Sequence, residues 1–360
     1  MEAAQFTCIN CGGSLEFKPG TQNLTCPFCG TVNENPEITP PEIHEELNYE
    51  KALEKLNSVT HTKQVQVVTC NACGGEVTLE PGVTTADCDF CGSHIIAGGQ
   101  SHTVMTPQYL LPFSIEKSTA VKSFREWIKR LKFAPNELKK QARITEPAKG
   151  IYYPFWTFDA DTETDYSGRR GIHHTRKVTS TDSSGKTTTS TVVETKWYPA
   201  RGKVRRLFDD ILIPASRTLV KKLLQRLKIW DFKNMVEYSD YYLSGFKGES
   251  YSIGLKEGLE DAKEIMTVQI RQDIRRDIGG DVQQITSMNT RYRDITFKYI
   301  LLPLWVVVYK FNKKYYQVLI NGSNGEIKGE RPVSILKILL LILIIAGAGA
   351  GIYFLVRFFR

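Results

Sequence analysis

The sequence predicts an α+β protein in three parts: two small cysteine-held units, a duplicated α+β module built on antiparallel sheet, and one apolar C-terminal helix. Three observations lead to this prediction. A cysteine-rich stretch at residues 6–30 recurs at residues 68–92, a fainter repeat links the regions that begin at Tyr109 and Tyr242, and residues 338–356 carry no charge. With 360 residues, the chain is long enough for two or three domains.

The two cysteine units together contain all 8 cysteines of the chain. Each has the spacing C-x2-C-x14-C-x2-C, and the second copy follows the first at an offset of 62 residues (70 − 8). Two C-x2-C pairs on tight turns complete a tetrahedral site of four thiolates, which is typical of a zinc ribbon. We therefore predict two structural Zn²⁺ ions. Their ligands are Cys8, Cys11, Cys26 and Cys29 in the first unit and Cys70, Cys73, Cys88 and Cys91 in the second.

Disulfide pairing of the same cysteines is the alternative interpretation. The opening "MEAAQFTCIN" lacks the basic and apolar segments of a signal peptide, so we expect a reducing compartment, where thiolates persist. Because four sulfur atoms fill the coordination shell of zinc, neither site keeps an open position for a catalytic water. The predicted metal sites are therefore structural.

The net charge of +8 hides an uneven distribution. Residues 1–100 carry 13 acidic and 4 basic side chains, net −9, and each zinc with four thiolates adds about −2. The remaining residues carry 43 basic and 26 acidic side chains, net +17. Since nucleic acid binding depends on Lys and Arg contacts to phosphate, the acidic N-terminal part disfavours that class of partner and favours a protein.

The C-terminal apolar segment is long enough to cross a membrane. Nineteen uncharged helical residues, 338–356, span about 28 Å, close to the hydrocarbon thickness of a bilayer. We predict a transmembrane anchor at residues 335–357, with a buried core helix as the alternative. Because so few residues follow it, insertion after synthesis is expected. The sequence thus predicts a single-pass, tail-anchored membrane protein with its N-terminal bulk in the cytoplasm.

The middle of the chain contains a second, fainter repeat. From Tyr109 and from Tyr242 an extended piece leads to an amphipathic helix and then to a strand with the pattern Pro-x-Trp. The apolar helix faces are Val121, Phe124, Ile128 and Leu131 in the first copy and Leu255, Leu259, Ala262 and Met266 in the second. The second copy continues as two strands with a turn at Asn324-Gly325.

Composition and repeats together predict the domain organisation. Residues 35–46 are rich in Pro and Glu and are typical of a linker, and residues 47–59 after them favour a short helix. The predicted parts are zinc ribbon 1 at 1–34, a linker with the short helix at 35–65, zinc ribbon 2 at 66–97, α+β module 1 at 108–208, α+β module 2 with a basic amphipathic helix at 209–333, and the anchor at 335–357.

Two motifs that suggest chemistry have simpler explanations. Gly185-Lys186-Thr187 lacks the upstream glycine of a phosphate-binding loop and precedes a strand-like Thr- and Val-rich run, which favours a hairpin loop. Four carboxylates, Asp159, Asp161, Glu163 and Asp165, share one face of a strand. They either hold a divalent cation or form a solvated face, and the sequence does not decide between the two. With no catalytic constellation and no cofactor-binding motif, we predict a non-enzymatic protein.

A basic amphipathic helix is expected at residues 216–230. Its apolar stripe is Leu219, Leu223, Leu227 and Trp230, and its other positions are rich in Lys and Arg. One interpretation is a solvated helix packed on the body of the protein. The other is a surface for anionic lipid headgroups or an acidic partner, which a nearby anchor would favour.

The tandem "CxxCGG…PG…CPFCG" units, the "PFW" and "PLW" strands and the "NGSNGEIKGERP" stretch resemble a family of bacterial proteins with tandem zinc ribbons and a C-terminal membrane anchor. Members are labelled as primosomal helicases or as carrying a TFIIB-type zinc ribbon, but this sequence lacks the ATP-binding loop of a helicase. The family tends to be encoded near flotillin-like (SPFH) membrane scaffold proteins. The resemblance implies a role in organising membrane-bound assemblies or in membrane-stress responses.

The leading hypothesis from the sequence is a membrane-anchored zinc-ribbon adaptor that recruits or regulates a cytosolic or membrane-scaffold protein. Its rival is a nucleic-acid-binding zinc-ribbon protein of the replication or helicase-associated kind, with the basic body as the contact surface. An enzyme with an unrecognised site is a weaker third. Gly347 and Gly351 form a GxxxG pair that allows homo-oligomers.

Overall fold

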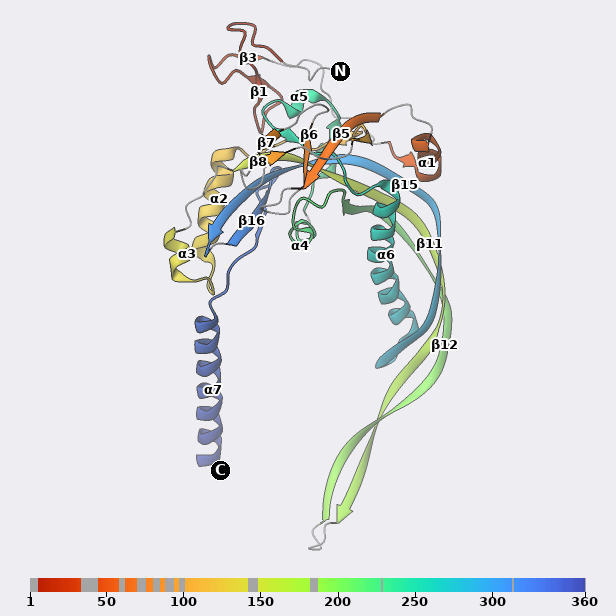
Figure 1. Cartoon of the computed structure of the whole chain (residues 1–360). Coiled ribbons are helices and arrows are strands. Elements are labelled where there is room, and N and C mark those ends of the chain that lie inside the picture. The colour runs from red at the N-terminus through yellow and green to blue at the C-terminus, as the bar shows by residue number, and fades with distance from the viewer. Residues whose placement is uncertain are drawn as a thin grey trace.

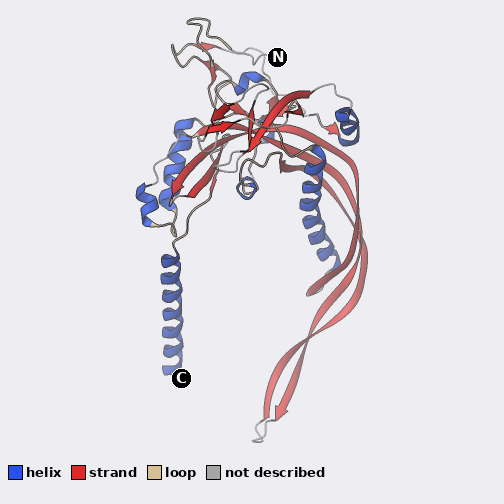
Figure 2. Cartoon of the chain, viewed as in Figure 1, coloured by secondary structure: helices blue, strands red, loops and turns tan. Residues whose placement is uncertain are grey.

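A computed structural model gives the fold. It describes residues 6–33, 45–57, 62–69, 76–79, 85–87, 94–96, 101–141, 148–181, 187–227, 229–312 and 314–359. The protein is a mixed α+β structure with antiparallel sheets, as predicted. A small N-terminal sheet sits beside a larger curved sheet, and an apolar helix ends the chain (Figures 1 and 2).

The first cysteine unit forms a three-stranded antiparallel sheet of β1 (Glu16–Phe17), β2 (Leu24–Thr25) and β3 (Val32–Asn33). A turn at Pro19-Gly20 joins β1 to β2, and Gly20 has a φ of 76°, a conformation that favours glycine. The unit packs on the body near α5 (Asp240–Leu243). There the Phe17 amide donates to the Ser244 carbonyl at 2.9 Å.

The second cysteine unit is described only in part. Backbone is present for β5 (Thr62–Thr69), β6 (Glu76–Leu79) and β9 (Ser101–Met105), which form one sheet, and for the pair β7 (Thr85–Asp87) and β8 (His94–Ile96). Its four predicted ligands, Cys70, Cys73, Cys88 and Cys91, lie outside the described residues. The predicted helix between the units is confirmed as α1 (Tyr49–Asn57).

Three long strands form the central sheet: β11 (Lys149–Thr181), β12 (Thr187–Pro214) and β15 (Val282–Phe311). β11 lies between the other two and is antiparallel to both. Shorter strands complete this sheet: β4 (Leu47–Asn48), β10 (Tyr109–Leu110), β13 (Val236–Glu237), β14 (Lys247–Gly248), β16 (Lys314–Asn321) and β17 (Ile327–Gly329). The predicted turn at Asn324-Gly325 is confirmed between β16 and β17.

The two halves of the fainter repeat exchange equivalent contacts across this sheet. β10 of the first half pairs in parallel with β15 of the second, and β14 of the second pairs in parallel with β11 of the first. The Trp156 indole donates to the Ile253 carbonyl at 2.9 Å, and the Trp305 indole donates to the Ile115 carbonyl at 2.8 Å. Both carbonyls lie just before a helix. The predicted modules thus share one sheet, while their boundaries stay a prediction.

The two prolines of the Pro-x-Trp strands lie where one side of the strand stops pairing with one neighbouring strand and begins to pair with another. β11 pairs with β14 before Pro154 and with β12 after it. β15 pairs with β10 before Pro303 and with β16 after it. Since proline has no N–H to donate to a ladder, this changeover tolerates it inside a sheet.

Two helices pack on the sheet through the apolar faces that the sequence predicts. α2 (Lys117–Arg130) buries Phe124 and Ile128, and α3 (Asn136–Gln141) follows it. α6 (Leu255–Ile278) packs along the inner side of the curved strands and buries an apolar face that includes Leu259 and Met266 (Figure 1). A short 3₁₀ helix, η1 (Phe232–Asn234), precedes β13.

The expected helix at residues 216–230 is much shorter than predicted. Among its described residues, only α4 (Lys221–Leu224) is helical, although Leu219, Leu223 and Leu227 are buried in the core as an apolar stripe would be. Arg217 pairs with Glu257, and Lys221 pairs with Asp261 at 2.7 Å, both on α6. The leucines are thus buried, and the basic side chains paired, by contacts with the rest of the body and not by a long helix. Packing on the body is therefore the better of the two earlier interpretations.

Two β-bulges bend the central sheet at the same level. Opposite residues 158–161 of β11, both β12 and β15 contain one extra residue. The bulges contain Asp210 and Asp294, whose φ values are 51° and 50°, a region that short polar side chains tolerate better than other non-glycine residues. Beyond this level the strands curve away from the body (Figure 1).

The final helix, α7 (Ile335–Phe358), has no buried residue. It is long and apolar enough to cross a membrane. Lys337 at its start donates to the Ala134 carbonyl at 2.7 Å, which ties the first turn to the segment between α2 and α3. The predicted C-terminal helix is therefore confirmed, while insertion into a membrane stays a prediction.

Because the two indoles occupy equivalent places, we expect equivalent losses on their removal. Trp156→Phe and Trp305→Phe should each lower the free energy of unfolding by about 2 kcal/mol, through one lost hydrogen bond and reduced packing. Urea unfolding of detergent-solubilised protein measures this. Trp197→Phe, at a site 43% exposed, is the control and should change stability by less than about 0.5 kcal/mol. A change this small in either buried variant would contradict the reciprocal role.

Candidate metal centre

The first cysteine unit presents two matching turns. The Gly12 amide donates to the Cys8 carbonyl, and the Gly30 amide donates to the Cys26 carbonyl, each at 2.9 Å. Gly12 and Gly30 have φ values of 73° and 74°, which lets the backbone turn directly after the second cysteine of each pair. The sequence pattern C-x2-C-G therefore forms the same local structure twice. Together the two turns bring the four sulfur atoms close to one another.

The four sulfur atoms have the separations that a tetrahedral metal needs. Cys8 Sγ and Cys29 Sγ lie 3.5 Å apart, Cys11 Sγ and Cys26 Sγ lie 3.4 Å apart, and all four atoms lie within 4.8 Å of one another. Zinc–sulfur bonds of about 2.3 Å in a tetrahedron place the sulfurs about 3.8 Å apart. The four cysteines are free thiols. These residues fit one metal ion, as the spacing predicts.

Hydrogen bonds in the unit favour the thiolate form at two ligands. The Thr31 hydroxyl, 3.1 Å from Cys29 Sγ, is the main cause that lowers the pKa of Cys29 to about 6. The Asn10 amide donates to Cys8 Sγ at 3.4 Å and lowers the pKa of Cys8. At Cys11 the Gly13 amide lowers the pKa, but the neighbouring thiols outweigh it and raise the pKa to about 12. A divalent cation would offset this crowding of negative sulfurs.

Each cysteine turn also exposes one large apolar side chain, which the sequence analysis did not single out. Ile9 lies between the first two cysteines and is 86% exposed, and Phe28 lies between the last two and is 77% exposed. Their position inside each C-x2-C pair was the sequence signal that could have identified them.

Three of the four carboxylates on the predicted acidic strand face lie against basic side chains. Glu163 is buried and accepts from Lys203 at 3.0 Å and from Arg291 at 2.7 Å. Hydrogen bonds from Lys203 and Arg205 lower the pKa of Glu163 to about 2. Asp161 and Asp165 pair with arginines of β15. These ion pairs favour a salt-bridged sheet face over a cation site at Asp161, Glu163 and Asp165.

The fourth carboxylate, Asp159, belongs to a different cluster formed by the bulges. Asp159, Asp209 and Asp210 gather with Glu46, which precedes β4, so that one oxygen of each lies within 4.8 Å of the others. The buried Lys298 ammonium lies 2.6 Å from Glu46 and 2.9 Å from Asp210. No sequence pattern predicted this cluster, because Glu46 lies more than 100 residues before its partners.

The carboxyls in this cluster titrate differently. Burial, and after it the hydrogen bond with Glu46, raises the pKa of Asp159 to about 7. Burial would also raise the pKa of Glu46, but hydrogen bonds with Asp159, Lys298 and Thr296 outweigh it and lower that pKa to about 2. Asp159 therefore holds a proton below pH 7 and donates it to the Glu46 carboxylate.

The chain is similar to a known bacterial protein over most of its length. It is 27% identical to the uncharacterized protein YdjG of Bacillus subtilis (strain 168) over 334 residues, which cover 91% of this chain and 90% of the relative. No protein-family model matches the chain, and no solved structure matches it. The likeness extends over nearly the whole length of both proteins.

Metal analysis tests the four-cysteine site directly. Purified protein should contain two zinc ions, and Cys26→Ser should remove one equivalent and unfold the first unit, because folding and metal binding are coupled in such small units. Plasma emission spectrometry gives the zinc content. Cys88→Ser, at the equivalent position of the second unit, is the matched variant and should also cost one equivalent. Unchanged zinc in Cys26→Ser, or eight cysteines in disulfides, would contradict the assignment.

The raised pKa of Asp159 predicts a pH-dependent stability. The unfolded carboxyl loses its proton near pH 3.8, whereas the folded one keeps it to about pH 7. The folded state therefore binds more protons in this window, and the free energy of unfolding falls as pH rises from 4 to 7. Asp159→Asn should lose this dependence. The free energy of unfolding of the variant minus that of the parent should therefore be larger at pH 8 than at pH 4. We expect this increase to be on the order of 1–2 kcal/mol after allowance for partial exposure.

Urea unfolding at a series of pH values measures this difference. Glu46→Gln is the companion variant, because removal of the acceptor should also lessen the pH dependence. A parent and an Asp159→Asn protein with the same slope between pH 4 and 7 would exclude a shared proton at this site.

Proposed function

We propose that this protein is a membrane-anchored, non-enzymatic adaptor. Its first cysteine unit captures a protein partner, and α7 holds the complex at the cytoplasmic face of a membrane. The observation that carries the proposal is the separation of two exposed apolar features. Ile9 and Phe28 lie on the cysteine unit at one side of the body, and α7 leaves from the other side (Figure 1).

The charge of the cysteine unit supports a protein partner. Residues 6–33 carry one acidic and one basic side chain, Glu16 and Lys18, so the unit offers no positive surface for phosphate. Two exposed apolar side chains, one on each turn of the cysteine unit, suit a complementary apolar pocket, where such anchors supply most of the binding energy. The resemblance described above makes a flotillin-like membrane scaffold one class of partner to test.

The contacts of the cysteine unit with the body also support an adaptor. The Tyr241 hydroxyl donates to the Gln22 carbonyl at 2.9 Å, and Phe17 packs edge-on against Tyr242 with ring centroids 5.1 Å apart. These contacts hold the unit at a fixed place instead of on a loose tether. A partner bound by Ile9 and Phe28 would therefore be held in a defined orientation relative to the anchor.

Partner capture tests the proposal. Ile9→Asp with Phe28→Asp should remove those proteins that co-purify with the parent from detergent-solubilised membranes, since a charge cannot enter an apolar pocket. Quantitative mass spectrometry of the co-purified proteins measures the loss, expected to exceed tenfold for a partner held by both side chains. Val268→Asp, at a site 58% exposed on α6, is the control and should keep the partner.

Two further results bear on the same proposal. Truncation after Ser334 should move the protein from the membrane pellet to the soluble fraction without loss of partner. If the double aspartate variant retains every partner, the cysteine unit is not the capture surface. If sequence-selective nucleic acid binding requires that unit, the rival nucleic-acid function replaces the adaptor.

A further inference from the structure

The hairpin of β11 and β12 extends far beyond its supporting strand. We call residues 167–201 the distal hairpin. β15 accompanies β11 only as far as Gly171, which pairs with Val282, and beyond that point β11 and β12 pair only with each other among the described residues. An isolated two-stranded hairpin is marginally stable in water. A surface that the hairpin contacts would therefore add support that the rest of the fold does not supply.

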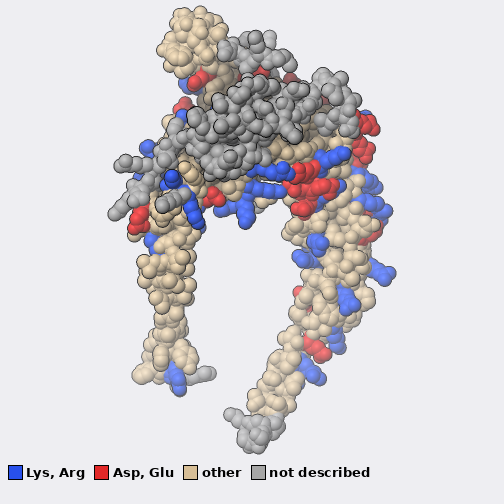
Figure 3. All heavy atoms as spheres, in the orientation of Figure 1, with Lys and Arg blue, Asp and Glu red and all other residues tan. Residues whose placement is uncertain are grey.

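The distal hairpin carries a strong positive charge. It has 7 basic and 2 acidic side chains. Six of the basic side chains are described, and all six are exposed: Arg169, Arg170, Arg176, Lys177, Lys196 and Arg201. None of these six has an ion pair with a described carboxylate, in contrast to Lys203, Arg205 and Arg206 nearer the body. Figure 3 shows basic side chains along this part of the molecule. The surface is complementary to an anionic partner.

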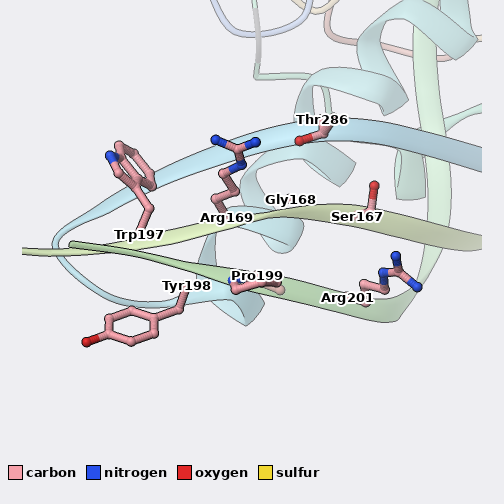
Figure 4. A pocket seen from close by; sticks show the side chains of 9 residues that line it. Ser167, Gly168, Arg169, Trp197, Tyr198, Pro199, Arg201 and Thr286 are labelled. Carbon is pink, nitrogen blue, oxygen red and sulfur yellow. The ribbon is translucent and has the colours of Figure 1, made fainter. Parts of the chain in front are cut away.

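A hollow of about 400 Å³ lies at the base of the distal hairpin (Figure 4). Arg169 and Arg201 line it, together with Trp197, whose ring is 43% exposed. On the opposite face of the hairpin, Arg170 lies over the Tyr198 ring, 5.9 Å from its centroid. Two guanidinium groups near one hollow suit a phosphate group, which arginine binds through paired N–H donors.

The position of the hairpin indicates where an anionic partner would come from. The distal hairpin and α7 leave the body on the same side (Figure 1). Exposed Trp and Tyr beside Arg and Lys are typical of proteins at the membrane–water interface, where the rings lie among the headgroups. Nucleic acid offers similar phosphates, but nothing brings it to the side of the body that carries α7.

We propose that the distal hairpin binds the anionic headgroups of the membrane that holds α7, with a lipid phosphate in the hollow between Arg169 and Arg201. The proposal rests on the membrane attachment given under Proposed function. It adds a second contact with the bilayer, which would fix the orientation of the body above the membrane. A single helix would leave the body free to rotate about its axis.

The proposal constrains how α7 is directed. A polar hairpin with open edges cannot enter hydrocarbon, because its unpaired backbone groups would lose their hydrogen bonds to water. The hairpin therefore stays in the headgroup layer while α7 continues into the bilayer. Residues 330–334, between β17 and α7, contain no helix or strand. For α7 to turn there, the hydrogen bonds from the Ser334 amide to Phe133 and from Lys337 to Ala134 would have to open.

Lipid quenching of Trp197 tests this contact in the full-length protein. The protein is inserted into phosphatidylcholine liposomes with about one third phosphatidylglycerol, whose acyl chains are brominated near the headgroup. The difference in quenched emission between the parent and Trp197→Phe isolates the Trp197 signal. We expect quenching in these liposomes and at least a twofold loss in liposomes without phosphatidylglycerol or in about 0.5 M salt, which screens headgroup attraction.

Matched variants assign the effect to the hollow. Arg169→Gln with Arg201→Gln should lower the quenching of Trp197 at least twofold. Lys18→Gln with Lys51→Gln removes the same charge from exposed sites elsewhere and should leave the quenching unchanged. Since all four side chains are exposed, none of these changes alters the core. Equal quenching in the two double variants would overturn the role of the hollow.

Carbonate extraction separates this proposal from membrane anchoring. If carbonate releases the protein, the anchor itself fails. If the protein resists carbonate but Trp197 is not quenched in the anionic liposomes, only the headgroup contact fails. If the full-length protein instead binds an oligonucleotide duplex, and that binding requires Arg169 and Arg201 while the liposomes produce no quenching, the hairpin binds nucleic acid and the proposal is overturned.

Discussion

The antiparallel pairing of β11 with β15 is the constraint on which the rest of the structure depends. Each strand comes from a different half of the repeat, and each presents a buried tryptophan to the loop that starts the other half's long helix. Backbone contacts repeat this exchange, since the Ile253 amide donates to Ala215 and the Ile115 amide donates to Gly322, both at 2.8 Å. Neither half can satisfy its buried indole without the other, so the two halves fold as one body.

The same pairing determines where the sheet bends. β12 and β15 each carry an extra residue at the level where β11 has Asp159 and Ala160, and the paired bulges turn all three strands together. This bend draws Asp159, Asp209 and Asp210 toward Glu46 and directs the distal hairpin to the side of α7. A local departure from regular pairing thus positions both an acidic cluster and a distant basic surface.

The arrangement suits the proposed adaptor in physical terms. The four-cysteine unit with exposed Ile9 and Phe28 is held on one side of the body by hydrogen bonds and aromatic packing. An apolar helix and a basic hairpin lie on the other. A rigid sheet between them would fix the orientation of a bound partner relative to the membrane, whereas a flexible linker of the same length would not.

The sequence by itself determined the parts whose rules are local. The cysteine spacing predicted the four-sulfur site of Cys8 and its partners, because two tight turns need only a few neighbouring residues. Period and apolarity predicted α2, α6 and α7. The tertiary structure alone decided what depends on distant residues: the exchange of Trp156 and Trp305 between halves, the bulges, the bond between Asp159 and Glu46, and the reduction of a predicted helix to α4. Those features follow from which strands meet, and no local pattern encodes that choice.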